Sequence, residues 1–431
     1  MSQKRKSSVR HTRAVRVAQS KHVPAPPPAA DVEARLTELI HPTTYAQLAL
    51  FRRLGLRNRL LTLPVMVALV VSMIWRQIGS ACELVRVLER EGFLWTSRLR
   101  VTQQALSDRL LHFPAVLFER VLLDLLPVLH ARWRERTRPV PPEVLHAQAY
   151  FDRLLIFDGS TLDVLLRKLK ALREMPVAPL AGRMGALLDL ASRLPVHLWY
   201  EPDAQAHDHR FIERLLTALR PRDLLVFDAG LLDFDWFEQL THKCVAFITR
   251  PHANLVYTVV EALQQTHYLR DQIVEVGSAT RQRLRLVEVV YQGQWYRYLT
   301  NVLDPVVLPP DLVAALYRRR WRIEEAFLVV KRLLGFAYLW VGAENGIQLQ
   351  LWATWLLYAV LIDLTDAVAQ ELDVLFEAVS VEMVFRGLYH FTTAYQRGEA
   401  DNAVTYLAHE ARSLGILKRP RKARQLLLSS P

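Results

Sequence analysis

The sequence predicts an α/β protein: helices come before the sheet, a β-rich insertion lies within it, and further helices follow it. Residues 31–135 carry apolar residues at 3- and 4-residue spacing, with almost no strand signal. After residue 153, short and wholly apolar runs appear, which are typical of strands buried in a covered sheet. Residues 250–305 read as β-rich, and residues 345–415 return to a helical pattern.

Length and charge bound the class of protein. A chain of 431 residues can form two or three domains with a sizeable core. Its net charge of +12 indicates a polyanionic partner, nucleic acid before an anionic membrane. The cysteines are Cys82 and Cys244, and neither belongs to a C-x-x-C pair. This pattern argues against a zinc ribbon or a disulfide scaffold and favours a reducing compartment.

Two apolar runs, residues 60–75 and 347–364, invite comparison with membrane spans, which need about 20 largely apolar residues. The first is too short and contains Pro64, and the second contains Asp363. We expect both to be buried helices. Residues 1–30 have no apolar centre of the kind found in secretory signals. We therefore expect a cytoplasmic protein without a membrane partner.

Basic segments stand near both ends of the sequence. Residues 1–30 contain lysines and arginines but no acid, and they are predicted to be a disordered arm. Residues 418–424 form a similar basic tail. Such segments contact nucleic-acid phosphates without sequence choice, or they serve only as solubilising tails.

Residues 31–140 are predicted to form a helical DNA-binding domain. Within it, residues 101–110 resemble the turn and second helix of a helix-turn-helix, with Thr102 as the helix cap. Gln103 and Arg109 would then reach phosphates or base edges. Small helical bundles contain similar stretches, so a plain bundle stays an alternative.

Two apolar runs end in an acid. Residues 154–157 run into Asp158, and residues 224–227 run into Asp228. An acid at the end of a buried strand is costly unless it is paired, neutralised or bound to a metal. Functional groups also collect at the carboxyl ends of strands in open α/β sheets. The alternative is that each aspartate only caps a turn with the glycine that follows it.

The intervening segment supplies further elements. Residues 184–190 and 196–200 are predicted strands, and residues 210–219 a helix. The His-Asp-His sequence at residues 207–209 suggests a metal site at first sight. It lacks the further ligands that zinc needs, so we expect a surface loop there.

The β-rich segment contains a predicted hairpin. Residues 283–291 and 295–300 are its strands, and Gln292 and Gly293 form the turn. Its arginines and aromatic residues would grip a nucleic-acid backbone, or they would line one solvated face of an ordinary hairpin.

A helix predicted over residues 317–331 organises the chain. At about 100° per residue, Tyr317, Arg320, Glu324 and Lys331 fall within about 60° of one another. An acid beside a phenol, a guanidinium and an ammonium suits a place where phosphate and metal ions meet. The alternative is an exposed helix laced with i,i+4 ion pairs.

The remaining positions of this helix have other roles. Glu325 points about 100° away from Glu324, so the two carboxylates are not equivalent. Trp321 is more consistent with a core residue than with a base-stacking one. A second side of the helix is predicted to pack on the core through Ile323, Phe327, Val330 and Leu334.

Asp158, Asp228 and Glu324 together predict a metal site. Three carboxylates from separate elements suit two divalent ions held about 3.5–4 Å apart. Such ions activate water or a 3′-hydroxyl for an in-line attack on phosphate. Magnesium uses few protein carboxylates and completes its octahedron with water and phosphate oxygens.

These residues resemble a known family. The spacing Tyr317-(2)-Arg320-(3)-Glu324-(6)-Lys331 is similar to the Y-(2)-R-(3)-E-(6)-K signature of DDE transposases of the insertion-sequence-four type. The resemblance extends over about residues 150–365. Asp158 in Asp-Gly-Ser resembles the first catalytic aspartate of that family, and Asp228 in Asp-Ala-Gly resembles the second, although Ala229 stands where the family often has arginine.

The resemblance implies an RNase H-like catalytic core in two parts, residues 150–249 and 311–345, with the β-rich insertion at 250–310 between them. Residues 346–431 would form C-terminal helices and the basic tail. The core would bind two Mg²⁺ ions, with Mn²⁺ able to replace them, through the catalytic residues Asp158, Asp228 and Glu324.

The resemblance also implies cut-and-paste movement of DNA bounded by terminal inverted repeats. The partners would be the double-stranded DNA of the element ends and target, and a second copy of the chain in a synaptic dimer. The setting would be the nucleoid of a prokaryotic cell. The DNA-contacting residues would be Tyr317, Arg320, Lys331 and Trp321, with Gln103 and Arg109 from the helical domain.

Two other readings stay open. A transposase-derived protein that binds DNA without cutting it would keep the fold and lose the chemistry. A nuclease on the same core would cut DNA without joining it.

Overall fold

The computed structural model describes residues 30–418, apart from residues 163–181, 204–205, 278–280, 337–339 and 341–342. The basic arm predicted for residues 1–30 lies outside the described residues, except for Ala30. The same holds for the basic tail beyond Lys418.

The centre of the protein is one nine-stranded sheet with the strand order β3-β2-β1-β4-β5-β9-β8-β7-β6. The parallel pairs are β1 with β4 and β4 with β5, and the other neighbours pair antiparallel. The strands are β1 (Arg153–Thr161), β2 (Arg183–Asp189), β3 (Pro195–Glu201), β4 (Asp223–Val226), β5 (Ala246–Thr249), β6 (Tyr257–Gln265), β7 (Leu269–Val276), β8 (Gln282–Tyr291) and β9 (Gln294–Thr300).

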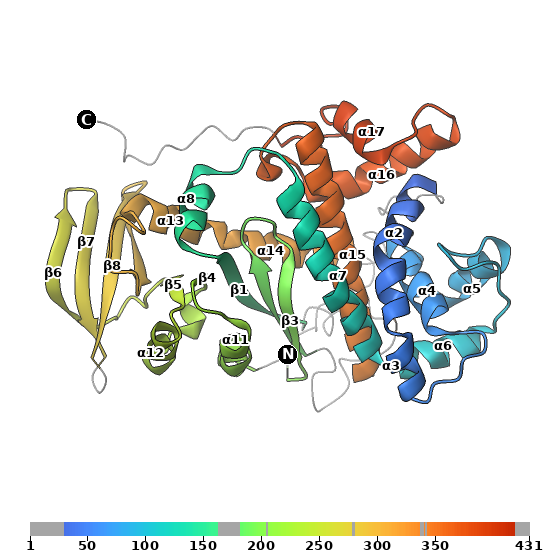
Figure 1. Cartoon of the computed structure of the whole chain (residues 1–431), viewed down its shortest axis with the longest axis horizontal. Helices are drawn as coiled ribbons and strands as arrows, with labels where there is room; N and C mark the ends of the chain where they lie inside the picture. The colour runs from blue at the N-terminus through green and yellow to red at the C-terminus, as the bar shows by residue number, and fades with distance from the viewer. Residues whose placement is uncertain are drawn as a thin grey trace, which may run out of the picture.

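Helices come before, between and after the strands (Figure 1). The helices before the sheet are α2 (Ala30–Ala46), α3 (Leu48–Arg53), α4 (Leu63–Trp75), α5 (Ala81–Arg90), α6 (Gln103–His112), α7 (Ala115–Glu135) and α8 (Pro142–Tyr150). Those between and after the strands are η1 (Asp208–Phe211), α11 (Ile212–Ala218), η2 (Ala229–Leu231), α12 (Phe234–His242), α13 (Pro310–Arg319), α14 (Trp321–Leu328), η3 (Val329–Leu333), α15 (Glu344–Glu371), η4 (Phe376–Ala378), α16 (Val381–Gln396) and α17 (Ala403–His409).

The strands predicted from the apolar runs are confirmed, and the β-rich segment extends the same sheet. Strand β9 pairs with β5 through Ile248↔Thr300 and Thr249↔Leu299, so the four strands β6 to β9 continue beyond β5 (Figure 1). The predicted hairpin of β8 and β9 is also confirmed. Gln292 and Gly293 in its turn both have positive φ, 52° and 75°, as a two-residue type I′ turn requires.

The two faces of the sheet pack on different cores. In β1, Leu154 and Ile156 belong to the large core shared with the helices, while Leu155 and Phe157 belong to a smaller core. The smaller core includes side chains of α11 and α12. This split follows from the period of two in a strand, which sends successive side chains to opposite faces.

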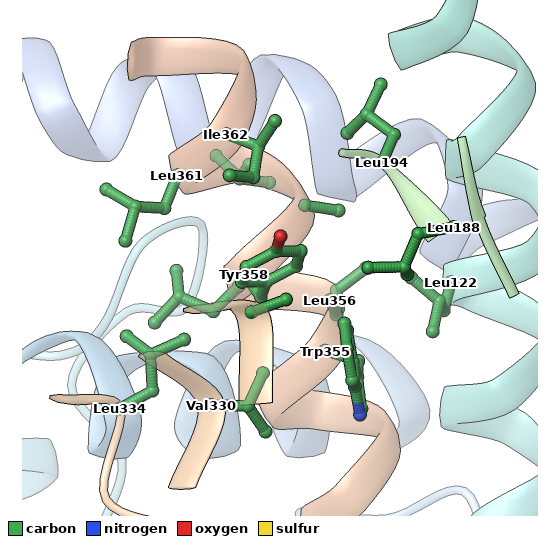
Figure 2. Close-up of a cluster of buried hydrophobic side chains, with 14 of the residues drawn as sticks. Leu122, Leu188, Leu194, Val330, Leu334, Trp355, Leu356, Tyr358, Leu361 and Ile362 are labelled. Atoms are coloured by element: carbon green, nitrogen blue, oxygen red, sulfur yellow. The ribbon is translucent and has the colours of Figure 1, made fainter. Parts of the chain in front are cut away.

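The large core is built around α15. Figure 2 shows Trp355, Leu356 and Tyr358 of this helix among side chains of the sheet, of α7 and of the segment after α14. Helices α2, α4, α7, α15 and α16 all contribute buried residues to this one core, so the segments before and after the sheet are packed together.

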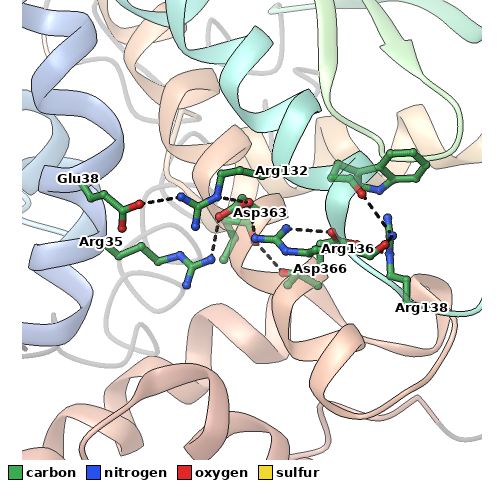
Figure 3. Close-up of polar contacts among 10 residues, drawn as sticks. Arg35, Glu38, Arg132, Arg136, Arg138, Asp363 and Asp366 are labelled. Atoms are coloured by element: carbon green, nitrogen blue, oxygen red, sulfur yellow. Dashed lines mark hydrogen bonds and ion pairs between the residues drawn. The ribbon is translucent and has the colours of Figure 1, made fainter.

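Helix α15 is long and apolar enough to cross a membrane, but 94% of its apolar window is buried inside the protein. The prediction of buried helices is therefore confirmed for this run and for α4, whose residues from Met66 to Trp75 are all buried. Two acids of α15, Asp363 and Asp366, are buried and paired with arginines from α2, α7 and the segment that follows α7 (Figure 3).

The helix predicted over residues 317–331 is in fact divided. Helix α13 ends at Arg319, and α14 begins at Trp321. At the junction, the N–H of Arg320 donates to the carbonyl of Tyr317 at 3.0 Å, a tighter i to i−3 contact. The last part is the π-helical turn η3, closed by Leu334 N–H to Val329 C=O at 2.9 Å.

Candidate active site

The paired strands β1 and β4 bring the two strand-end aspartates together. Their parallel register ends at Ile156↔Val226, two residues before Asp158 and Asp228. Alternation within β1 places the Asp158 side chain on the face of Leu154 and Ile156, which is the face of the large core. Asp228 follows the end of β4 and caps η2, and its charge is close enough to repel that of Asp158.

The sequence predicted that Asp158 ends its strand, but Asp158 lies within β1. Strand β1 continues to Thr161 because Asp158 to Thr161 still pair with β2, at Asp158↔Ala186 and beyond. Only the parallel pairing with β4 stops before the acid. Asp158 is therefore still held in the sheet through β2, and its side chain is buried.

The Asp158 carboxylate is buried and shared between two donors. Its Oδ2 accepts a hydrogen bond from Arg320 Nη1 at 2.7 Å, and its Oδ1 accepts one from the Gly159 N–H at 2.9 Å. Burial raises the pKa of Asp158 to about 7; Arg320 opposes this rise, whereas repulsion from Asp228 and Glu324 adds to it. Asp228 and Glu324 therefore lie close enough to Asp158 for their charges to repel it.

Asp228 also has a local role. Its Oδ1 accepts the Gly230 N–H at 2.8 Å and caps η2, which is the turn-capping alternative raised from the sequence. The backbone carbonyl of Asp228 accepts the Thr249 hydroxyl at 3.2 Å. These contacts orient the carboxylate but leave its other oxygen available.

Glu324 and Lys331 approach β1 from the helix side. Lys331 Nζ lies 2.5 Å from Ser160 Oγ and 2.8 Å from the Thr161 carbonyl. Burial lowers the pKa of Lys331 to about 8, although attraction by Glu324 and Asp158 opposes this fall. Among the described residues, no hydrogen bond or ion pair within 4.0 Å fixes the Glu324 carboxylate itself.

Tyr317 is buried at the same junction. Its ring lies 5.2 Å from that of Tyr298 on β9 and 5.9 Å from the Arg320 guanidinium. Burial raises the pKa of Tyr317, so the phenol keeps its proton at neutral pH. The structure thus places Tyr317 beside Arg320, which contacts Asp158, and Lys331 beside Ser160, although the single helix that the spacing assumed is broken at Arg320.

Trp321 corrects a prediction. The sequence favoured a core position, but 63% of this side chain is exposed. Its ring stands 5.9 Å from the Arg320 guanidinium, at the edge of the site. Trp321 is the first residue of α14, directly after the break at Arg320. The predicted apolar face is confirmed instead, since Ile323, Phe327 and Val330 are buried.

Asp208 is an acid near the two aspartates that the sequence did not reveal, and it lies against Gly159 on the opposite face of β1 from the Asp158 side chain. Its Oδ1 accepts hydrogen bonds from Arg183, at 2.9 Å from Nε and 2.5 Å from Nη2. Burial raises the pKa of Asp208. Attraction by Arg183 opposes this rise, and repulsion from Asp228 adds to it. Asp208 also contributes to the raised pKa of Asp158. The predicted surface position is confirmed for His207 and His209, which are exposed, but the predicted loop is wrong for Asp208 and His209, which belong to η1.

Gly159 makes this approach possible. A Cβ atom at this position would lie 1.8 Å from Asp208 Oδ1 and 3.0 Å from Arg183 Nη2. Gly159 pairs with Gly185, and a Cβ there would lie 3.0 Å from the Phe211 ring. Because neither glycine has a side chain, η1 can pack closely against the sheet at these two positions. The glycine after Asp158 was the sequence signal for a close approach, but Asp208, which makes that approach, lies far along the sequence.

The residues predicted to contact DNA from the helical segment lie on α6. Thr102 caps this helix by accepting the Ala105 N–H at 3.1 Å, as predicted. Gln103 is exposed. Arg109 donates to the Leu61 carbonyl at 3.0 Å, and its guanidinium lies over the Phe113 ring. Arg109 therefore also stabilises the segment that contains Leu61. Figure 1 shows α6 well apart from β1 and α14.

The donors of the site suit a hard divalent cation, which takes carboxylate oxygens as ligands. Within the part of the chain that the structure describes, no three histidine, cysteine or acidic side chains are close enough to form a preformed metal cluster. Burial is the main cause of the raised pKa of Asp158, and repulsion from Asp228 and Glu324 adds to it, so a bound cation would lower the cost of ionising this carboxylate. By this criterion the donor set fits such an ion.

Part of the chain is similar to known proteins. Residues 179–360 match the protein family described as the transposase DDE domain. A relative in Sinorhizobium fredii, named "Putative transposase y4zB", is 26% identical over 191 residues, covering 39% of this chain. The aligned part is 52% of that relative, so the chain spans about half its length. The family match includes Asp228 and Glu324, whereas Asp158 precedes it.

Proposed function

We propose that the protein is a DDE transposase of the insertion-sequence-four type that cuts the ends of a DNA element and joins them to a target. One observation carries the proposal. Asp158 on β1 and Asp228 just after β4 follow the last paired residues of two neighbouring parallel strands, and Arg320 contacts Asp158 while Lys331 contacts the adjacent Ser160. The strand order β3-β2-β1-β4-β5, with β2 antiparallel and β4 parallel to β1, supports an RNase H-like core.

Asp158, Asp228 and Glu324 would hold two Mg²⁺ ions, or Mn²⁺ in their place. When bound, these ions supply an activated water or 3′-hydroxyl and neutralise charge on the phosphate. The remaining groups bind the DNA. Lys331 carries its charge below a pKa of about 8, and the Arg320 guanidinium can form two parallel hydrogen bonds to a phosphate.

The DNA contacts proposed outside the acids come from two places. At the site, Tyr317 donates a hydrogen bond to phosphate, and the exposed ring of Trp321 stacks on a base. Gln103 and Arg109 on α6 contact the double-stranded element end at a distance from the cut. Because both ends must be cut and joined together, a homodimer is the expected synaptic form, in the cytoplasm at the nucleoid of a prokaryotic cell.

The first test needs only DNA. Sequencing the DNA beside the gene should reveal short inverted repeats bounded by target duplications. A duplex that carries such a repeat then serves as substrate in Mg²⁺. The parent should nick it at the repeat boundary, while Asp228→Ala and Glu324→Gln should cut at least about 100-fold more slowly. Asp235→Asn, an exposed acid on α12, is the matched control and should cut normally.

The outcomes separate the alternatives. Equal cutting by the parent and Asp228→Ala would refute the proposed site. Binding to the repeat without nicking under any divalent ion would indicate a transposase-derived DNA-binding protein. Nicking without joined products in a strand-transfer assay would indicate a nuclease.

A further inference from the structure

Glu325 lies beside Glu324 on α14 but has a different environment. Its Oε2 accepts a hydrogen bond from Arg193 Nη1 at 3.1 Å, and its Oε1 accepts one from Arg322 Nη1 at 2.7 Å. Burial would raise the pKa of Glu325, but Arg193, Arg322 and Lys418 outweigh it and hold this pKa below its ordinary value. Glu325 is therefore an ionised contact on the side of α14 that faces away from the acids.

Helix α14 needs such a contact because it is short and interrupted at both ends. It has 8 residues, with the tight junction at Arg320 before it and the π-helical turn η3 after it. Two turns of helix with irregular ends have few backbone hydrogen bonds, so tertiary contacts determine their orientation. On one side these are Arg320 with Asp158 and Lys331 with Ser160.

On the other side the anchor is Arg193, in the turn between β2 and β3. Arg193 is buried and has φ of 62°, an unusual conformation for a residue with a side chain. The Tyr358 hydroxyl donates to its carbonyl at 3.1 Å, and its guanidinium lies 4.7 Å from the Phe376 ring centroid. These contacts make Arg193 a rigid point that belongs to the sheet and to α15.

Further ion pairs between arginines and glutamates link α14 to the neighbouring helices. Arg322 Nη2 donates to Glu377 Oε2 at 3.2 Å, and Glu377 also pairs with Arg319 at the end of α13. Arg319 in turn donates to Glu143 on α8 at 2.6 Å from Nη2. The network therefore holds both α13 and α14 against the body of the protein.

A cavity of about 200 Å³ lies beside this network and is lined in part by Arg193, Arg322, Glu325 and Val329. Close packing that would otherwise fix α14 is missing there. If the Glu325 charge were lost, the helix could shift toward this space, and Glu324 would move with it.

We propose that Glu325 is a positioning residue: by pairing with Arg193 and Arg322 it sets the orientation of α14 and thereby the place of Glu324 opposite Asp158 and Asp228. This inference rests on the proposed function for its catalytic consequence, but the positioning itself is a property of the fold. A misplacement of the order of 1 Å at a catalytic group costs up to about 100-fold in rate.

The test compares Glu325→Gln with Glu382→Gln. Glu382 lines the same cavity but pairs with Arg386 on its own helix, so it is the matched control. Glu325→Gln should cut a duplex bearing the inverted repeat about 10- to 100-fold more slowly at saturating DNA. Its Kd for that duplex and its Tm should stay near those of the parent, and Glu382→Gln should match the parent in every measurement. A purely structural role would instead lower Tm and DNA affinity together with the rate.

Hydrogen–deuterium exchange gives a second measurement that does not depend on cutting. Amides of residues 321–328 should exchange several-fold faster in Glu325→Gln than in the parent or in Glu382→Gln. Unchanged exchange in this helix, or undiminished cutting by Glu325→Gln, would overturn the inference. If the parent itself cuts no repeat DNA, the proposed function fails, while the exchange experiment still decides the role of Glu325.

Discussion

The guanidinium of Arg320, at the junction of α13 and α14, donates a hydrogen bond from Nη1 to Oδ2 of Asp158 in β1 at 2.7 Å. Both residues are buried. This pair joins the junction of α13 and α14 to the sheet, and it opposes the effect of the neighbouring acids on the pKa of Asp158. Burial alone would lower the pKa of Arg320, but Asp158, Tyr317 and Asp228 raise it, so the guanidinium stays charged.

The free energy of unfolding should respond to pH through Asp158. Its pKa rises from 3.8 to about 7 on folding, so the unfolded chain releases this proton first as the pH increases. The parent therefore loses stability between about pH 4 and pH 7 at this site, whereas Asp158→Asn cannot titrate. The stability of Asp158→Asn relative to the parent should rise through that window, by at most roughly 1.4 kcal/mol per pH unit, and level off above it.

Urea unfolding followed by circular dichroism at pH 5, 6, 7 and 8 measures this difference. Asp235→Asn, which removes an exposed acid, should show none of it. A stability difference for Asp158→Asn that is constant with pH would contradict the burial argument.

Gly159→Ala should destabilise the protein although it adds one methyl group. The new Cβ would lie 1.8 Å from Asp208 Oδ1, so either the Arg183–Asp208 ion pair or β1 must shift. We expect a loss of about 1–3 kcal/mol in the free energy of unfolding. Gly79→Ala is the control, because a Cβ there meets no atom within 4 Å. Equal stability of the two variants would show that η1 moves away from β1 without cost.

The buried pair of Arg285 and Asp271 should be essential for the β-rich part of the sheet. Arg285 Nη2 lies 2.6 Å from Asp271 Oδ2, and its Nη1 donates to the Leu308 carbonyl at 2.7 Å, just before α13. Arg285→Met would leave the Asp271 charge buried and unpaired, at a cost of about 3–5 kcal/mol. Arg283→Met, on the same strand but 64% exposed at its side chain, should cost little.

Denaturant unfolding of both variants measures these costs. Adding Asp271→Leu to Arg285→Met should restore part of the loss, because no charge then stays buried without a partner. No restoration would mean that the arginine's contacts with the Leu308 carbonyl matter more than charge balance.

Asp363 should hold the N-terminal helices on α15. Its carboxylate receives Arg35 at 2.7 Å, Arg136 at 2.6 Å and Arg132 at 3.4 Å (Figure 3). Asp363→Asn would leave these arginines part-buried without a full counter-charge, so we expect a loss of about 3 kcal/mol. Glu38→Gln, which affects the exposed partner of Arg132, is the control.

Limited proteolysis gives a local view of the same change. Cleavage within α2 should become faster in Asp363→Asn than in Glu38→Gln. If both variants are cleaved at the parent's rate, the apolar packing of α2 holds it without the ion pairs.

The sequence by itself determined the local elements and the side they present. The short, wholly apolar runs predicted β1 and β4, and the Gln292–Gly293 turn predicted the hairpin of β8 and β9. Helical spacing identified the buried face of α14 and the charged face that reaches the site. These features could be predicted because each depends on backbone geometry over a few consecutive residues.

Only the tertiary structure decided which charges meet. Asp158 and Arg320 are 162 residues apart in sequence, and Arg193 and Glu325 are 132 apart. Asp208 approaches β1 where Gly159 leaves room for it, and Trp321 is exposed although the sequence favoured a core position. The physical reason is common to all of them: the free energy of a buried charge depends on its neighbours in space, and pattern along the chain does not specify them.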